Sequence, residues 1–262
     1  EGGGTYVDRT LALRTLQGYL YCGVTSVYDS GNFEDFIFEL RAAERAGAIV
    51  APRIFATGAN ITVPGGYGDN AFSIKVANLE ADRPALLAHF ERKPDLQKIL
   101  YDSLGSFGTP MAPVLPDATL RGVIELANLR GIPTTVHSIT ELASRTLLAA
   151  GIDAFAHPVR AAASRDFVQL LAVKRIPVST TLVVLSHIAR VVDDPGFLDA
   201  PLFRATVEPA QLAQEKGPAR LRYVENGMSP QFRLMMPHVS ATVKRMHEAG
   251  VDPQKIYFHD MG

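Results

Sequence analysis

The chain has 262 residues, of which 47% are hydrophobic and 20% charged, with a formal net charge of -1. This length allows one large α/β domain with a sizeable core, and we treat residues 1–262 as a single domain. The small net charge gives no reason to expect nucleic acid or an anionic membrane as a partner, and no apolar run is long enough to span a bilayer. The single cysteine excludes an internal disulfide.

The first four residues, Glu1-Gly2-Gly3-Gly4, lack the basic and apolar pattern of a signal peptide, and no initiator methionine precedes them. We therefore expect that an upstream segment was removed or is not included. Among compartments the cytoplasm is favoured. The expected partner is a small-molecule substrate, and the formation of a homo-oligomer stays open.

Strand-like and helix-like segments alternate along the whole chain. Short β-branched or apolar runs predict strands, and longer amphipathic runs that stop at glycine predict helices. The predicted helices are 8–21, 33–48, 84–92, 117–130, 140–150, 164–174 and 239–249. The predicted strands are 23–28, 52–57, 97–101, 133–137, 153–157, 177–184 and 255–258.

Two segments between these elements have a different composition. Residues 58–70 are rich in glycine. We interpret them as a loop at the open end of the predicted domain, where the backbone can approach a substrate closely. Residues 187–237 are long and rich in proline and polar residues. Loops of this length are usually functional, so we expect this one to cover the same open end, to contain short helices around 210–224 and to influence substrate preference.

The alternation of strands and helices predicts a parallel sheet. A doubly wound open sheet usually has a phosphate-binding turn after its first strand, and the sequence Asp29-Ser30-Gly31 is not such a turn. Seven strands preceded by a helix match an eight-stranded βα barrel whose first strand is missing. The predicted fold is therefore an α/β, TIM-like (β/α)8 barrel that lacks its first strand.

Four ionisable residues lie at or near the ends of predicted strands. His137 and His157 are the last residues of two predicted strands, Asp260 closes the run 256–259, and Lys98 lies within a strand. In a barrel of this kind the catalytic groups lie at the carboxyl ends of the strands. A structural role is the more common explanation for each residue alone, but four such placements together favour a shared site.

These residue types fit a catalytic metal centre. Neutral histidine nitrogens bind zinc, and a catalytic site has three protein ligands and one open position. His137 and His157 would supply two ligands. An ammonium group cannot bind a metal, but Lys98 could do so as a carbamate formed with carbon dioxide. Asp260 would accept the proton of the metal-activated water, whose pKa falls to about 7.

At these residues the chain resembles the amidohydrolase superfamily of the binuclear, carboxylated-lysine type. The segment ending in Lys98 resembles the strand that carries the bridging lysine, and residues 131–137 and 151–157 resemble the two single-histidine strands. Residues 23–31, 52–58 and 64–69 resemble the second strand, the third strand and the active-site loop. The resemblance covers nearly the whole chain. It implies one or two divalent ions, with zinc as the favoured metal, bound by Lys98, His137, His157 and Asp260. It is greatest to dipeptidases and related amide hydrolases.

The sequence departs from the family pattern in three places. It contains no His-x-His pair and none of the flanking β-sandwich segments. Either the chain is a fragment or the more buried metal site is lost. Tyr67 stands where several relatives have histidine, and the sequence around Asp260 differs from the usual one. Tyr67 and, on the long segment, His187 are our candidates for substrate contact, whereas we expect His89 and His247 at the surface, His238 near the start of the last helix and Cys22 packed.

The predicted function is hydrolysis of an amide or related C–N bond in a dipeptide, an N-acyl amino acid or a cyclic amide. Two other functions stay open. Lys98 could form a Schiff base with a carbonyl substrate in a lyase or aldolase, although this leaves the two histidines without a role. A non-catalytic relative that only binds a ligand would explain the absence of the His-x-His pair, because fold alone does not determine function.

Overall fold

The computed structural model describes residues 7–103 and 111–251. The strands are β1 (Ser26–Asp29), β2 (Arg53–Ala56), β3 (Asn60–Thr62), β4 (Ser73–Lys75), β5 (Gln97–Leu100), β6 (Thr134–His137) and β7 (Ala154–Phe155). The helices are α1 (Arg9–Tyr21), α2 (Glu34–Arg45), α3 (Leu79–Glu91), α4 (Asp117–Asn128), α5 (Glu141–Ala150), α6 (Arg165–Lys174), α7 (Leu182–Asp193), η1 (Pro195–Asp199), α8 (Pro201–Thr206), α9 (Pro209–Gln214), η2 (Glu215–Ala219), α10 (Arg220–Glu225) and α11 (Met228–Glu248).

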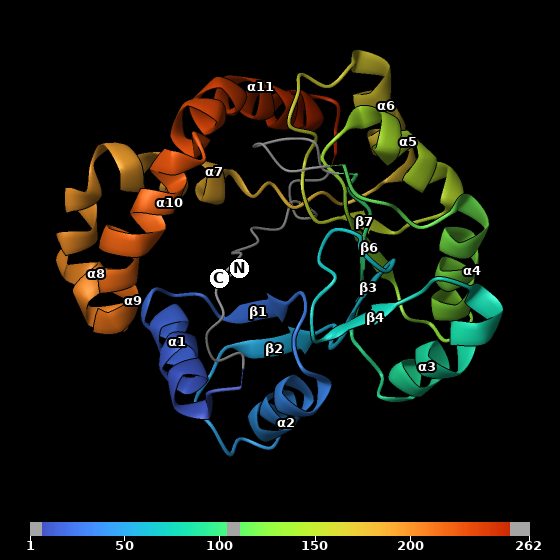
Figure 1. Ribbon diagram of the computed structural model, residues 1–262, viewed down its shortest axis with the longest axis horizontal. Helices are drawn as coiled ribbons and strands as arrows, with labels where there is room; N and C mark the ends of the chain where they lie inside the picture. The colour runs from blue at the N-terminus through green and yellow to red at the C-terminus, as the bar shows by residue number, and fades with distance from the viewer. Residues whose placement is uncertain (1–6, 104–110, 252–262) are drawn as a thin grey trace.

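The strands lie inside a ring of helices (Figure 1). All strand pairs are parallel, and β5, β6, β7 and a single bridge at Val178 follow one another in chain order. These features confirm the α/β class with parallel strands and covering helices. Within residues 7–103 and 111–251 the strands form two sheets, β1-β2 and β4-β3-β5-β6-β7, and do not form one closed barrel.

Side chains connect the two sheets where the backbone ladder is interrupted. The Thr57 hydroxyl donates to the Leu96 carbonyl (2.5 Å) and accepts from the Lys98 backbone N–H (2.7 Å). The Asp95 carboxylate accepts from the Ala56 backbone N–H (2.9 Å) and from Arg41 (2.7 Å). These contacts attach β2 to β5 and fix the position of the strand that carries Lys98.

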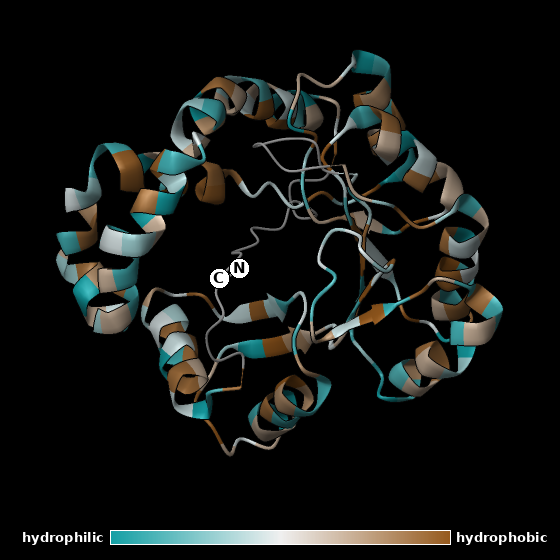
Figure 2. Cartoon of the chain, viewed as in Figure 1, coloured by the Kyte–Doolittle hydropathy of each residue, from teal (hydrophilic) through white to brown (hydrophobic). Residues whose placement is uncertain are grey.

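A row of apolar side chains runs across the larger sheet on one face. The parallel register aligns Ile99, Val136, Phe155 and Val178, and all four are buried in one core. Hydrophobic and hydrophilic bands alternate along the surrounding helices (Figure 2), as expected for helices that bury one side. Because side chains of a strand alternate between faces, Lys98 and His137 lie on the opposite face from this row.

Helix ends follow their sequence signals. The Thr140 side chain accepts from the Ala143 backbone N–H at the start of α5, and Gly151 ends this helix with φ of 92°. Asn78 caps α3 five residues earlier than we expected, so α3 begins at Leu79 and not at residue 84. No helix in the described part of the chain is both long and apolar enough to cross a bilayer.

The largest corrections concern the second half of the chain. Residues 177–184 were expected to form a strand, but only Val178 makes a bridge and α7 begins at Leu182. The expected last helix, 239–249, extends back to Met228, because Phe232 and Val239 continue its buried face against Leu185 of α7. The predicted strand 255–258 lies outside the described residues.

The two segments expected to be loops also contain regular structure. The glycine-rich segment 58–70 includes β3, which pairs with β4. Residues 187–237 contain the short helices expected around 210–224, but most of the segment is helical and forms part of the outer ring (Figure 1). His238 therefore lies in the middle of α11, and Cys22 is exposed where we expected it packed.

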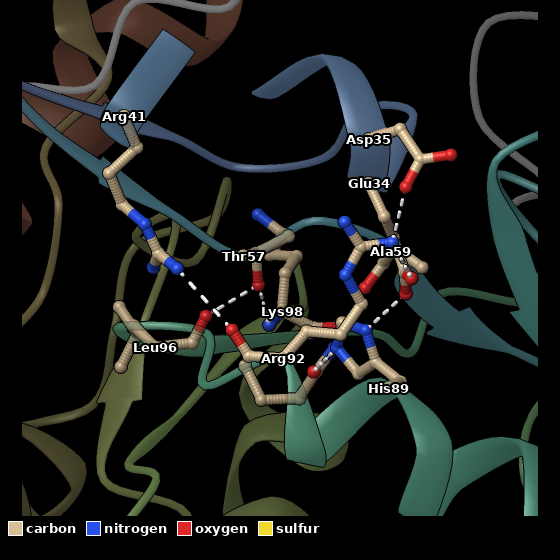
Figure 3. Close-up of polar contacts among 10 residues, drawn as sticks. Glu34, Asp35, Arg41, Thr57, Ala59, His89, Arg92, Leu96 and Lys98 are labelled. Atoms are coloured by element: carbon tan, nitrogen blue, oxygen red, sulfur yellow. Dashed lines mark hydrogen bonds and ion pairs between the residues drawn. The ribbon is translucent and has the colours of Figure 1, made fainter. Parts of the chain in front are cut away.

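His89 was expected at the surface and is instead buried between α3, α2 and β5. Its Nδ1 contacts the Glu34 carboxylate (Figure 3). Its Nε2 lies 2.6 Å from Gln97 Oε1. The Gln97 side-chain amide donates to the carbonyls of Ala59 and Lys98, so its oxygen is the accepting end. The His89 ring therefore lies between two acceptors, the Glu34 carboxylate and the Gln97 side-chain oxygen.

The contact between His89 and Glu34 predicts an acid-sensitive contribution of Glu34 to stability. The His89 hydrogen bond lowers the pKa of Glu34 below 4.5, opposed by burial and assisted by the charges of His89 and Arg92. Because the unfolded state then binds the proton more readily, Glu34 stabilises the fold above the usual carboxyl pKa, and this contribution is lost as the pH falls through the lowered pKa. Urea unfolding at a series of pH values should show a shallower acid-side decline for Glu34→Gln.

The control is Glu39→Gln, on the same helix, because Glu39 is exposed and pairs only with Arg9 among the described residues. An acid-side slope in Glu34→Gln identical to that of the unmodified chain would contradict the assignment.

Candidate active site

Lys98 is the second residue of β5, and its side chain is 3% exposed. Burial lowers the pKa of its amine to about 7, because the charged form loses its water without gaining a counter-ion. No carboxylate in the described part of the chain forms an ion pair with this amine within 4.0 Å. With this pKa a substantial fraction of the Lys98 amine is neutral at pH 7, and the neutral form is the one that can react with carbon dioxide or with a carbonyl.

His137 ends β6 and is buried. The pKa of His137 is lowered to about 4, chiefly by burial and also by the charge of Lys98, which together outweigh the hydrogen bond to Asp102. The pKa of Lys98 is not shifted by His137 in return, because His137 is already neutral at the pH where Lys98 titrates. The imidazole is therefore neutral at pH 7, which is the state that binds metals.

Asp102 orients the His137 ring. Its Oδ2 lies 3.0 Å from His137 Nε2, and both side chains are buried. A neutral ring that donates from Nε2 leaves Nδ1 as the nitrogen with a lone pair. In metalloproteins, a carboxylate placed in this way fixes the tautomer of a metal-binding histidine.

The His157 and Tyr67 rings both contact the His137 ring. The centroids of His137 and His157 are 4.6 Å apart with the rings edge to face, and Tyr67 stacks on His137 at 4.4 Å. His157 follows β7, and its Nδ1 lies 3.4 Å from the Thr181 hydroxyl. The structure thus brings together Lys98, His137, His157 and Tyr67, four of the six residues singled out from the sequence.

The two other candidates do not join this cluster in the described structure. Asp260 lies outside the described residues. His187 is on α7, where its Nε2 lies 3.7 Å from Glu215 and its ring contacts Phe197. Its described contacts therefore lie within the helical segment 182–219, which packs on the outside of the strands.

Sequence reasoning missed Asp102 and Arg160, which lie beside the histidines. Burial lowers the pKa of Arg160, while Tyr67 and Asp102 raise it through their charges, so the three side chains are close. Asp102 stands two residues after β5, and the rule that identified His137 and His157 could have found it. Arg160 follows β7 by five residues in an irregular turn, and the pattern of the sequence carries no signal for its burial.

The contact between Asp102 and His137 predicts that removing the Asp102 charge weakens metal binding without abolishing it. Asp102→Asn keeps the shape of the side chain but removes the charge that orients His137. Loss of such a partner weakens metal binding by about 10–100-fold, and we expect this range for zinc measured by competition with a chelator. Asp117→Asn, on an exposed carboxylate at the start of α4, is the control. Zinc affinity unchanged in Asp102→Asn would show that Asp102 does not act on a metal ligand.

Comparison with known proteins shows the fold that this site belongs to. No family model matches the sequence, and no curated protein matches it at a significant level. Similar solved structures include an amidohydrolase (TM-score 0.67, 16% identity, 95% of this chain and 57% of that one). A Xaa-Pro dipeptidase with bound methionine matches with TM-score 0.66, 18% identity and 98% and 61% coverage. The ochratoxinase of A. niger matches with TM-score 0.59, 16% identity and 91% and 61% coverage.

These matches confirm the resemblance to the amidohydrolase superfamily at the level of the fold. The chain shares the α/β architecture of amidohydrolases and prolidases over nearly all of its own length. It spans 57% to 61% of the length of these three proteins.

Proposed function

We propose that the chain forms a metal-binding active site that hydrolyses amide or related C–N bonds. One observation carries the proposal: the buried Lys98 lies on β5 and His137 on the neighbouring β6, and the ring of His157, which follows β7, contacts the His137 ring. The fold shared with amidohydrolases and prolidases supports the same reaction class.

The donor set fits a divalent ion with one addition. Residues 7–103 and 111–251 contain no group of three or more His, Cys, Asp or Glu placed to hold a metal. His137 and His157 supply two nitrogens, so a third ligand must come from Lys98 or from outside this part of the chain. The neutral form of the Lys98 amine can attack carbon dioxide, forming an N–C bond and releasing one proton, and the resulting carbamate offers two oxygens. Zinc prefers such nitrogen and oxygen ligands.

The residues of the chain have distinct parts in this proposal. A bound divalent ion supplies Lewis acidity toward the scissile carbonyl and toward water. Asp102 holds the His137 ring, and Tyr67 covers that ring on its stacked face. Asp260 is proposed to take the proton from the attacking water and to deliver it to the leaving nitrogen.

The substrate class is proposed from the same comparison. Among the similar structures are a Xaa-Pro dipeptidase, a prolidase complexed with a phosphonate analogue of proline, and molinate hydrolase. Dipeptides, N-acyl amino acids and cyclic amides are therefore the first compounds to test. The sequence has no His-x-His pair, so we expect about one ion per chain and no tightly bound second ion.

Metal analysis of the purified protein tests the proposal, combined with hydrolysis assays before and after chelation. We expect a bound divalent ion and hydrolysis that chelation removes and zinc restores. Turnover that resists chelation, with borohydride trapping a carbonyl substrate on Lys98, would support the Schiff-base alternative instead. Metal or ligand binding without turnover of any tested amide would indicate a non-catalytic relative.

A further inference from the structure

Thr181 stands directly before α7, at the position where a threonine commonly caps a helix with its side chain. Here the Thr181 side chain makes no capping hydrogen bond to α7. A capping residue also has an extended backbone as a rule, whereas Thr181 is left-handed, with φ of 43° and ψ of 24°. Because Thr181 is buried, its hydroxyl needs a partner other than this helix.

The left-handed backbone is unusual for this kind of residue. The other non-glycine residues with positive φ in the described part of the chain, Lys93 and Arg175, are exposed and stand at helix ends, where this conformation is common. Thr181 is buried, β-branched and at the start of a helix, and positive φ is an outlier for a β-branched residue. Residues held in such conformations cluster at functional sites.

The Thr181 hydroxyl contacts His157. Its Oγ1 lies 3.4 Å from His157 Nδ1, and both side chains are buried. In a neutral imidazole one nitrogen donates and the other carries the lone pair, so the partner of one nitrogen determines which nitrogen can bind a metal. Asp102 has this place beside Nε2 of His137, and Thr181 has the corresponding place beside Nδ1 of His157.

We propose that Thr181 is a positioning residue for His157. Its left-handed backbone places the hydroxyl to accept the Nδ1–H of His157, so that Nε2 of this ring keeps the lone pair for the metal. The inference rests on the proposed metal-dependent function and deepens it, because it assigns the group that orients the second histidine ligand. The unusual backbone of Thr181 is then a requirement of the site.

The first test compares zinc affinity with thermal stability. Thr181→Val keeps the β-branched shape and removes the hydroxyl, and zinc affinity should fall by about 10–100-fold, as for other partners of metal ligands. Thr181→Ser keeps the hydroxyl and should restore most of the affinity. The matched control is Thr242→Val: Thr242 is also buried, but its hydroxyl accepts from the Ala163 backbone N–H (3.1 Å). This control should lower the thermal midpoint and leave zinc affinity unchanged.

The second test observes the His157 ring directly in metal-free protein. Nitrogen-15 NMR of the histidine rings distinguishes the two neutral tautomers, and the His157 signals are those that disappear in His157→Ala. The unmodified chain and Thr181→Ser should show His157 with the proton on Nδ1. Thr181→Val should lose this preference, and Thr242→Val should keep it. This measurement needs neither a bound metal nor turnover.

The outcomes separate this inference from the hydrolase proposal. A proton on Nδ1 that Thr181→Val loses supports the inference, even if no amide is cleaved and the hydrolase proposal fails. If the unmodified chain binds no zinc, the tautomer alone decides. Zinc-dependent hydrolysis together with a His157 tautomer that is the same in Thr181→Val would leave the hydrolase proposal standing and overturn the inference. Equal zinc affinity of Thr181→Val and the unmodified chain would overturn it as well.

Discussion

Replacing either His137 or His157 with alanine is expected to remove the bound divalent ion and to abolish amide hydrolysis. The two rings are in contact on the inner face of the sheet and would supply two of the three ligands. Loss of a partner that merely orients a ligand already costs about 10–100-fold in metal affinity, so loss of a ligand should exceed about 100-fold. Metal content after gel filtration and zinc competition with a chelator measure the effect.

The control for this experiment is His247→Ala, because His247 is exposed on α11. It should keep the metal content and the activity of the unmodified chain. Near-normal zinc affinity in both His137→Ala and His157→Ala would remove the metal site and the hydrolase assignment together. Circular dichroism of each variant separates loss of a ligand from loss of the fold.

Replacing Lys98 with methionine is expected to have two opposite effects. Metal binding and hydrolysis should be lost, since methionine cannot form a carbamate. The metal-free protein should become more stable at pH 7, because burial lowers the pKa of Lys98 from 10.5 to about 7. Each pKa unit corresponds to about 1.4 kcal/mol, so removing the buried amine should raise the free energy of unfolding by a few kcal/mol.

The pH dependence gives the sign of this stability effect. Between about pH 7 and the usual lysine value, the unfolded chain holds a proton that the folded chain has released. Folding stability therefore rises with pH across this interval, and Lys98→Met should flatten the rise. Urea unfolding of metal-free protein across this range measures it. Lys244→Met is the control, because the Lys244 side chain is exposed on α11.

Chemical rescue tests the carbamate itself. In Lys98→Ala, bicarbonate with a short carboxylic acid should partly restore metal binding, because the acid can occupy the place of the carbamate oxygens. Restoration of turnover by a short primary amine, without restored metal binding, would favour the Schiff-base role of Lys98. A Lys98→Met variant that keeps full metal content would contradict the proposed ligand role.

The sequence by itself determined the fold class and the residues at the centre of the candidate site. Strands that alternate with amphipathic helices have a local signature, since the periods of the two elements differ and glycine marks the helix ends. His137 and His157 stand out because each directly follows an apolar run. Lys98 stands out as a charge within such a run. The structure places Lys98 on β5, His137 on the neighbouring β6, and His157 two residues after β7.

Only the tertiary structure decided which other polar residues join them. His89 has the sequence environment of a surface helix residue. Its burial follows from its contacts with Glu34 on α2 and Gln97 on β5, and both of these elements pack against α3 only in the folded chain. Arg160 gains its place beside Tyr67 and Asp102 in the same way, through packing. The segment 177–184 reads as a strand because Val and Thr favour strands locally.

Long-range packing overrides that local preference. Leu185 on α7 packs against Phe232 and Val239 on α11, and this apolar contact between segments about fifty residues apart stabilises a helix where local propensity favours a strand. A contact of this kind has no signature in either segment alone, because the burial that stabilises it exists only once both helices have formed.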